Sequence, residues 1–393
     1  MKRDVYLVLV AQFLTAFADN AILFTAITMV NQTAQAPSWY VPALQASFLV
    51  AFVLLAPWVG PYADGRPKAQ VLTTANIVKG VGAALLMFGI DPLLAYGVVG
   101  LGAAMYSPAK YGILPELVEE GQLVKANGWV EGSTILAILV GMLVGALLSE
   151  RSIVLALGVV VALYVTSALT ALWITRLPAG KPNPGPALPH FAKMVRSLLS
   201  TPRARFSTLG VSLFWAASVV LRVILVAWAP IVLMMTHTSD IAQLSMFLAL
   251  GIAVGAMFAA RVIPIAYLRR ARLAAYALGV LVLALSMVDS LLGARIVLFL
   301  AGIAGGLFVV PINAVLQEVG HRSIGAGGAV AVQNFFENLA MLAATGLYTL
   351  AAAQGVAPVP ALIGLAVFVL IATFLVSWHL PKDTGRINEI LPP

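Results

Sequence analysis

The sequence predicts an all-helical membrane protein with twelve transmembrane helices in two halves, and three observations support this prediction. First, 61% of its 393 residues are hydrophobic and 10% are charged, with a mean hydropathy of +1.00, a composition that soluble globular domains do not have. Second, apolar runs of about 20 residues, the length that crosses a bilayer as a helix, recur along the chain. Third, one long polar connection divides these runs into two sets of six.

The predicted spans are separated by proline, glycine and charged residues. They cover residues 6–30, 43–63, 70–90, 93–114, 123–148, 152–176, 206–234, 241–263, 271–290, 294–317, 325–353 and 357–379. The polar connection contains six prolines and five basic residues. We therefore expect an N-terminal six-helix bundle (1–176), a cytoplasmic linker (177–205) and a C-terminal six-helix bundle (206–393).

Basic residues predict the orientation of the chain in the membrane. With both termini in the cytoplasm, only Arg151 and Arg295 lie outside. Of the 23 lysines and arginines, Lys79, Lys110 and Arg222 lie inside spans and away from their ends. The remaining eighteen lie in cytoplasmic segments or at the cytoplasmic ends of spans. Positive loops beside an anionic leaflet also account for the net charge of +8, so no nucleic-acid partner is expected.

The first span has a carboxylate and an amide near its centre, Asp19 and Asn20. At a rise of about 1.5 Å per residue, Asp19 lies about 20 Å from the end of the span, near the middle of the bilayer. A carboxylate there costs roughly 2.5 to 3.5 kcal/mol on insertion scales, so it is expected to face the protein interior and to be paired or protonated. It either makes a structural hydrogen bond to a neighbouring helix or belongs to a substrate site.

Charged and amide side chains recur in the other spans. The charged set is balanced, with the acids Asp19, Glu131 and Glu337 and the bases Lys79, Lys110 and Arg222. The amides nearby are Asn313, Gln333, Asn334 and Asn338. A balanced set can satisfy itself at rest and exchange partners with a zwitterionic or anionic ligand. For Lys79, Glu131 and Glu337, a purely structural ion pair is an equally good interpretation.

Spans five and eight each contain two glycines four residues apart, Gly141 with Gly145 and Gly251 with Gly255. Small residues at this spacing let helices approach closely. We expect these pairs to pack either across an interface between the two halves or within one bundle.

The connection after the second span places glycine, acid and base at close spacing. Its residues are Gly60, Asp64, Gly65, Arg66 and Lys68. The spacing and the predicted side resemble the signature between spans two and three of the major facilitator superfamily of transporters. The resemblance implies a gating loop in which Asp64 caps a helix end or pairs with a basic neighbour, and an ordinary solvated turn is the alternative. It also implies a substrate site between two six-helix bundles.

Five further motifs lie in register over nearly the whole chain. They are FADNA at 17–21, YSPAKYGIL at 106–114, SLFW at 212–215, FVVPINA at 308–314 and AVQN at 331–334. Together they resemble the bacterial lysophospholipid transporter family. The resemblance implies a multi-pass inner-membrane flippase that moves lysophosphatidylethanolamine and lysophosphatidylglycerol from the outer to the inner leaflet. A partner acyltransferase on the cytoplasmic side would then re-acylate them.

The chain departs from that family's pattern at two places. It reads QEVG at 317–320 and GGA at 327–329. Both lie near the predicted cytoplasmic ends of spans ten and eleven, where they bear on gating more than on the class of substrate.

The resemblance places Asp19, Lys110, Arg222 and Asn313 on the spans that line the cavity. Arg222 is the best phosphate ligand, because a planar guanidinium can donate two parallel charge-assisted hydrogen bonds. Asp19 either binds the ammonium of ethanolamine or holds a basic neighbour, and Asn20 adds an amide. Lys110 is expected to be a second phosphate contact or a gate residue.

The remaining polar residues in spans are expected to support this site. Glu131 and Glu337 either support the binding residues or pair with Lys79 and Lys110. The amides assigned to the same role are Gln333, Asn334 and Asn338. Because an acyl tail gains about 0.8 kcal/mol per buried methylene, we expect alternating access with lateral access of the lipid, in which only the headgroup crosses along the charged residues.

The sequence lacks the residues that metal binding and common enzymatic mechanisms need, and it leaves one alternative transport function open. The chain has no cysteine, and its four histidines lie in loops or at span ends, so no metal, cofactor or enzymatic activity is expected. We expect a monomer in the bilayer. A proton-coupled exporter of drugs or siderophores, with Asp19 or Glu131 as the proton carrier, is the alternative function. The sequence leaves open whether transport is passive or ion-coupled.

Overall fold

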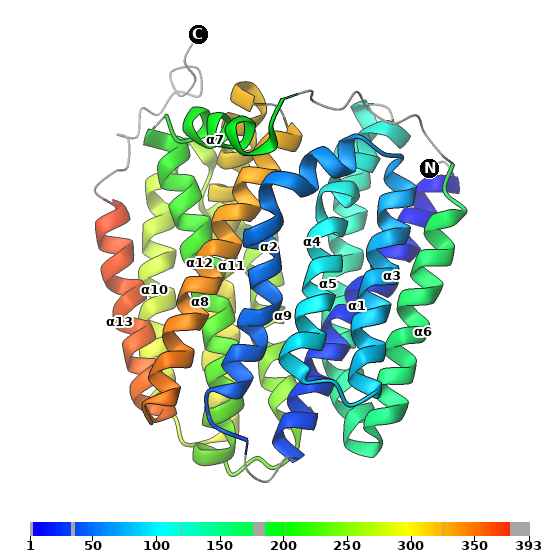
Figure 1. Cartoon of the computed structure of the whole chain (residues 1–393). Coiled ribbons are helices and arrows are strands. Elements are labelled where there is room, and N and C mark those ends of the chain that lie inside the picture. Colours follow the sequence, from blue (N-terminus) through cyan, green and yellow to red (C-terminus); the bar gives the residue numbers. More distant parts are fainter. Residues whose placement is uncertain are drawn as a thin grey trace. The chain divides into compact units, whose positions relative to one another are not determined.

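The computed structural model describes residues 3–32, 36–118, 120–175, 185–200, 202–324 and 326–377, and within these ranges it contains helices and no β-strand (Figure 1). The helices are α1 (Arg3–Gln32), α2 (Tyr40–Asp64), α3 (Lys68–Met87), α4 (Pro92–Leu117), α5 (Glu120–Arg151), α6 (Ile153–Leu172), α7 (Ala187–Leu198), α8 (Pro202–Val232), α9 (Thr238–Val262), the 3-10 helix η1 (Ile265–Arg270), α10 (Ala271–Leu285), α11 (Leu291–Ile324), α12 (Ala326–Ala353) and α13 (Pro358–Ser377). The all-helical fold class predicted from the sequence is confirmed.

Contacts divide the chain into two compact units. Unit 1 comprises Met1–Ala192 and His237–Ala242, and unit 2 comprises Lys193–Thr236 and Gln243–Pro393. The exact bundle and linker boundaries expected from the sequence stay predictions.

Ten helices in the described part of the chain are long and apolar enough to cross a membrane: α1, α2, α3, α5, α6, α8, α9, α11, α12 and α13. By contrast, α10 has 15 residues and ends at Leu285, before the predicted end of its span at residue 290. Fifteen residues rise about 22 Å, which is less than the hydrocarbon thickness. The count of twelve spans and the cytoplasmic position of both termini stay predictions.

A helix that the sequence pattern did not predict, α7, lies in the polar connection between α6 and α8. Its Phe191 and Leu198 are buried, whereas Lys193 and Arg196 are exposed. Pro189 falls in its first turn, where proline is tolerated. This distribution is typical of an amphipathic helix that lies on a surface rather than one that spans a bilayer.

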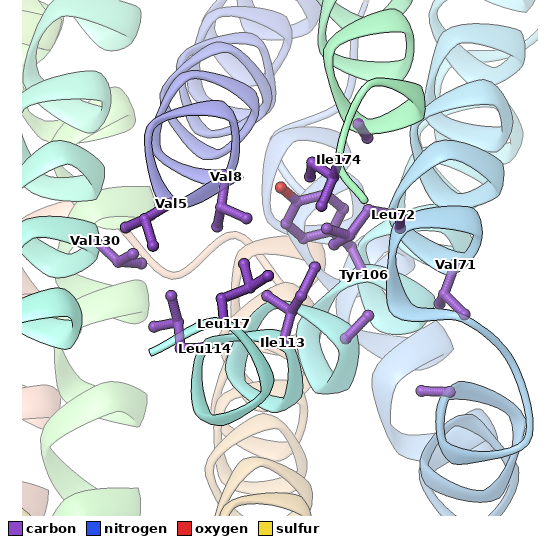
Figure 2. Packing of buried hydrophobic residues seen from close by; sticks show 14 of the residues in the cluster. Val5, Val8, Val71, Leu72, Tyr106, Ile113, Leu114, Leu117, Val130 and Ile174 are labelled. Carbon is purple, nitrogen blue, oxygen red and sulfur yellow. The ribbon is translucent and has the colours of Figure 1, made fainter. Parts of the chain in front are cut away.

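Unit 1 is organised around α1. This helix packs against α5 and α6, while α3 packs against α4 and α6, and α2 packs against α4. One core cluster joins α1, α3, α4 and α5 through apolar side chains that include Val5, Leu72, Tyr106 and Val130 (Figure 2). Because α1 is enclosed in this way, its Gln12, Thr15, Thr25 and Thr28 are buried.

Unit 2 is organised around α8. This helix packs against α11, α12 and α13, and α10 packs against α11 and α13. Most of α8 is buried, including Trp228, which has no exposed surface. Arg222 lies two-thirds of the way along α8 and is half-buried.

The paired glycines of α5 and α9 allow close approach within each unit. A Cβ on Gly141 would lie 2.5 Å from the Phe17 carbonyl oxygen of α1, and one on Gly145 would meet Ala21. In unit 2, a Cβ on Gly251 would meet the carbonyl of Phe299 of α11. Of the two alternatives given by the sequence, the structure shows packing within one bundle, because backbone of the same unit lies against these glycines.

Candidate functional site

A buried ion pair occupies the centre of unit 1. Lys79 Nζ of α3 lies 2.8 Å from Asp19 Oδ2 of α1, and Tyr164 of α6 donates its hydroxyl to Asp19 Oδ1 at 2.8 Å. Lys79 also donates to Thr15 Oγ1 at 3.0 Å and lies 4.7 Å from the ring centroid of Tyr106. The Lys79 side chain is 1% exposed and that of Asp19 is 23% exposed. Asp19 therefore holds a basic neighbour, which is one of the two roles expected for it.

Further polar contacts extend this pair along α1. Thr15 donates to Asn76 Oδ1 of α3 at 2.7 Å, and Asn76 donates to Ser167 Oγ of α6 at 3.0 Å. Ser167 in turn donates to the carbonyl of Ala11 at 2.8 Å. The chain of contacts ties α1, α3 and α6 together.

Three other predicted site residues lie on helices of unit 1. Asn20 donates its side-chain amide to the carbonyl of Ala16 on its own helix at 2.9 Å. Lys110, on α4, is buried with 8% of its surface exposed. Glu131 lies on α5, and its side chain falls outside those that the structure describes.

In unit 2, an amide links α11 to α12. Gln333 Nε2 donates to Asn313 Oδ1 and to Glu337 Oε1, both at 2.7 Å. Asn338 donates to the carbonyl of Asn334 at 2.7 Å. Gln333 and Glu337 are 7% and 8% exposed, respectively. These polar residues of α11 and α12 are called the α12 cluster below.

Arg222, the expected phosphate ligand, lies on α8 in unit 2 and is half-buried. The helices of the α12 cluster, α11 and α12, both pack against α8. The basic residue and the amide–acid cluster are thus carried by neighbouring helices of one unit.

The loop between α2 and α3 is held by a lysine at its end. Lys68 Nζ lies 3.1 Å from Asp64 Oδ1, donates to the carbonyl of Ala63 at 3.1 Å, and lies 3.7 Å from Glu116 Oε1 of α4. Arg66 lies over the ring of Tyr62, 4.2 Å from its centroid. Lys68 thereby neutralises the carbonyl end of α2 and connects it to α4.

The two glycines of the predicted gating loop have simpler surroundings, and Gly60 lies within α2 rather than in the loop itself. Gly65 ends α2, and its N–H donates to the carbonyl of Pro61 at 3.0 Å. A Cβ on Gly60 would meet nothing within 4 Å. No neighbouring atom in unit 1 therefore requires a glycine at position 60.

The structure brings together some predicted residues and adds others that were missed. Asp19 is the acid that pairs with Lys79, which was one of the bases expected to pair with Glu337. The residues that the sequence analysis missed are Thr15, Asn76, Tyr106, Glu116, Tyr164 and Ser167. Thr15 and Asp19 are four residues apart and Asn76 and Lys79 are three apart, so polar residues recurring on one helical face were the available signal. Within the described residues, no three histidine or acidic side chains gather as a metal site.

Comparison with known proteins agrees with this architecture. Residues 8–345 match the Major Facilitator Superfamily. A solved bacterial homologue of the human lysosomal transporter Spinster, in an inward-facing and unoccupied conformation, has a TM-score of 0.70 at 18% identity, covering 98% of this chain and 99% of that one. The helical fold and the charges buried within its spans define a membrane transporter, and the chain belongs to the Major Facilitator Superfamily.

Two curated relatives narrow this assignment. The lysophospholipid transporter LplT of Klebsiella pneumoniae subsp. pneumoniae is 44% identical over 382 residues, which are 96% of each chain. The protein of the same name from Escherichia coli strain SE11 is 44% identical over 377 residues, or 95% of each chain. Within the superfamily, the chain belongs to the lysophospholipid transporter family.

Proposed function

We propose that this chain is a lysophospholipid transporter of a bacterial inner membrane. The single observation that supports this most strongly is the 44% identity to curated lysophospholipid transporters over nearly the full length. The cargo would be lysophosphatidylethanolamine and lysophosphatidylglycerol, moved from the outer to the inner leaflet. The buried acids, bases and amides of the spans suit a small charged headgroup better than an apolar drug.

The phosphate of the headgroup would bind to Arg222, with Lys110 as a second contact or a gate. A guanidinium offers a planar fork of N–H donors that matches two phosphate oxygens. Arg222 is half-buried on α8, which shields those bonds in part from water. Asp19, Asn20 and Asn313 complete the proposed binding set. The contact of Asp19 with Lys79 supports the role of holding a basic neighbour within that set.

The acyl tail would stay in the bilayer while the headgroup crosses. Transfer of a tail of about fifteen methylenes into water costs on the order of 12 kcal/mol at 0.8 kcal/mol each, which no set of headgroup contacts offsets. We therefore propose alternating access in which the lipid reaches the site laterally. The loop of Gly60, Asp64, Gly65, Arg66 and Lys68 is the proposed gating element, supported by the way Lys68 links α2 to α4.

Several properties complete the proposal. The chain would act as a monomer, without a cofactor and without enzymatic activity of its own. An acyltransferase on the cytoplasmic side would consume the delivered lipid. Glu131, Glu337, Gln333, Asn334, Asn338 and Lys79 would support the binding residues.

The test is lipid movement by the purified protein in liposomes. Fluorescent lysophosphatidylglycerol is added outside, and the fraction that albumin can no longer extract is followed over time. Arg222→Ala should reduce the initial rate at least tenfold, whereas Arg222→Lys, which keeps the charge but loses the fork, should retain an intermediate rate. Arg261→Ala, an exposed arginine at the end of α9, is the matched control. Normal transport by Arg222→Ala would refute the phosphate assignment.

A further inference from the structure

Three arginines of unit 2 lie where η1 meets α10, with no acid of the described structure to balance them. Arg269 and Arg270 are the last two residues of η1, and Arg272 is the second residue of α10. The sequence has no aspartate or glutamate from residue 241 to residue 288. Among the ion pairs of the described residues, none includes one of these three arginines, which are called the arginine cluster below.

Arg269 has a hydrogen-bond donor that the fold encloses without using it. Its side chain is half-buried, and its Nε is buried with no hydrogen-bond partner among the described residues. The helices packed against η1 are α10 and α11, and within the described part of the chain neither supplies an acceptor for this nitrogen. A buried donor on a charged group is costly to leave without an acceptor, so this nitrogen indicates a place for an oxygen-bearing anion.

Arg270 is held by an aromatic ring instead of an acid. Its guanidinium carbon lies 4.6 Å from the ring centroid of Tyr267, and both side chains are exposed. Contact with the face of a ring uses the charge of a guanidinium but gives its N–H donors no oxygen acceptor. Tyrosine is also enriched at the boundary between bilayer and water. Arg270 is therefore fixed in position at such a boundary, with donors that match phosphate oxygens.

The surface of α10 that follows the arginine cluster is apolar and exposed. Leu273 is 63% exposed and Val280 is 55% exposed, and Ala277 between them is exposed as well. Starting from Arg270, these residues follow at intervals of three, four and three, so they lie on one face of the helix. A positive group at the head of an apolar strip matches a phospholipid, with its headgroup at the arginine and an acyl chain along the strip.

The length of α10 places the arginine cluster at the level of the lipid headgroups. Its 15 residues rise about 22 Å, whereas the hydrocarbon core is about 30 Å thick. A short span is accommodated by a thinner bilayer or by flanking side chains that extend to the phosphates. No side chain caps the first turn of α10, so the positive end of its helix dipole adds to the charge of the arginines.

We propose that the arginine cluster binds the phosphate of an anionic diacyl phospholipid, in the leaflet that the predicted topology makes cytoplasmic. Arg269 and Arg270 donate to the phosphate oxygens, Arg272 adds positive charge, and an acyl chain lies along the exposed face of α10. This lipid is a resident of the membrane and not the cargo, so the inference does not depend on the proposed function. Orientation in the membrane calls for basic residues at this end, but it accounts neither for the buried donor nor for the guanidinium held by Tyr267.

The experiment compares two diacyl lipids on the purified full-length protein in detergent. Native mass spectrometry gives the Kd for phosphatidylglycerol and for phosphatidylethanolamine with the wild type, Arg269→Gln and Arg269→Lys. We expect the wild type to prefer phosphatidylglycerol and Arg269→Gln to lower that preference roughly tenfold, which is the worth of a hydrogen bond to a charged group. Arg269→Lys, which keeps the charge but has no Nε, should lie between the two. Equal Kd values of the wild type for both lipids would overturn the inference.

Two controls separate this site from general attraction and from the transport site. Arg196→Gln removes an exposed arginine in the last turn of α7 and should leave the lipid preference unchanged. A loss as large as that of Arg269→Gln would mean that net charge alone attracts the lipid, and the site would not exist. Arg222→Ala should also keep the preference. If it removes the preference while Arg269→Gln does not, the lipid occupies the proposed transport site and the inference is wrong.

Melting temperatures test the two remaining partners of Arg269. Phosphatidylglycerol should raise the melting temperature of the wild type more than that of Arg269→Gln, and inorganic phosphate at the same concentration should raise neither. Equal protection by inorganic phosphate would make the ligand a soluble anion and contradict the proposal. The internal candidate is Glu318 of α11, whose side chain lies outside those that the structure describes. If Arg269→Gln lowers the melting temperature as much without lipid as with it, an acid of the chain is the partner and the lipid site is refuted.

Discussion

The contacts of Lys79 account for the cost of placing an ammonium in the interior of unit 1. Its partners are a carboxylate and a hydroxyl of α1 and the face of an aromatic ring of α4. Breaking one half of a buried pair leaves the other charge without a partner, which costs more than removing both. The Asp19–Lys79 pair should therefore behave as one thermodynamic unit.

A double-mutant cycle tests this coupling. Asp19→Asn should destabilise the folded protein by roughly 3 kcal/mol, because the Lys79 ammonium then has no anionic partner. Adding Lys79→Met should recover much of that loss. Thermal unfolding in detergent measures the four proteins of the cycle. Strictly additive losses would show that the two charges do not depend on each other.

At the residue scale, the sequence identified the charged residues inside the spans. It did not identify the partners with which they pair. A charge inside a 20-residue apolar run is visible without a structure, so Asp19, Lys79 and Glu337 were all identified. Their partners were not, because Lys79 lies sixty positions from Asp19 and the register of α1 against α3 is set by packing. The Tyr164 hydroxyl was missed for another reason, since tyrosine in a span reads as an ordinary aromatic residue.

At the scale of elements, glycines set how closely α9 and α11 approach. A Cβ on Gly302 of α11 would meet the carbonyl of Leu248 and lie 2.8 Å from the Cα of Gly251. Both neighbours are backbone atoms, which cannot move aside as a side chain can. The sequence predicted close helix packing at the glycine pairs of α5 and α9 but not the partner helix, because spacing within one helix does not identify its neighbour.

Gly302→Ala should therefore destabilise unit 2 by about 1 to 3 kcal/mol through overpacking. Gly364→Ala on α13 is the control, since a Cβ there meets nothing within 4 Å, and it should be neutral or slightly stabilising through better helix propensity. The melting temperatures of both variants in detergent, each compared with that of the wild type, test this prediction. Equal effects of the two substitutions would contradict the close approach of α9 and α11.

The contact between α4 and the loop before α3 has a dependence on pH. Glu116 lies beyond the predicted span 93–114, and burial raises its pKa above the ordinary value of 4.5, while the nearby Lys68 ammonium lowers it in part. Because the folded state holds this proton more tightly than the unfolded chain, the stabilising contribution is complete below pH 4.5 and is lost as pH rises through the raised pKa.

Glu116→Gln should reduce the fall in melting temperature of the purified protein between pH 4.5 and neutral pH. Subtracting the melting temperatures of variant and wild type at each pH removes the contribution of all groups that titrate alike in both proteins. The same slope in both proteins would mean that Glu116 titrates alike when folded and unfolded.

Helix α7 shows where prediction from hydrophobic runs reaches its limit. The segment is too short and too polar to be predicted as a transmembrane span. Prolines precede it and lie in its first turn. Its buried positions, Phe191 and Leu198, are seven residues apart, which is a helical period but a sparse one. Secondary structure of this kind depends on a surface to lie on, so it is visible only once the rest of the fold exists.

At the scale of the whole molecule, orientation is the prediction that connects structure to direction of transport. The chain has no cysteine, so single cysteines can be introduced without background labelling. Ser200→Cys, in the connection after α7, should react with an impermeant maleimide only from the cytoplasmic side. Ser290→Cys, in the connection before α11, should react only from the outside. Both positions are exposed, and the reverse pattern would invert the membrane topology.

The central claim is that this chain carries lysophospholipid across a bilayer. The most direct measurement is the rate at which fluorescent lysophosphatidylglycerol leaves the outer leaflet of liposomes that contain the purified wild-type protein, with no drug and no imposed proton gradient. We predict a rate well above that of protein-free liposomes. Equal rates in the two preparations, together with drug accumulation that requires a proton gradient, would contradict the account and favour a proton-coupled exporter.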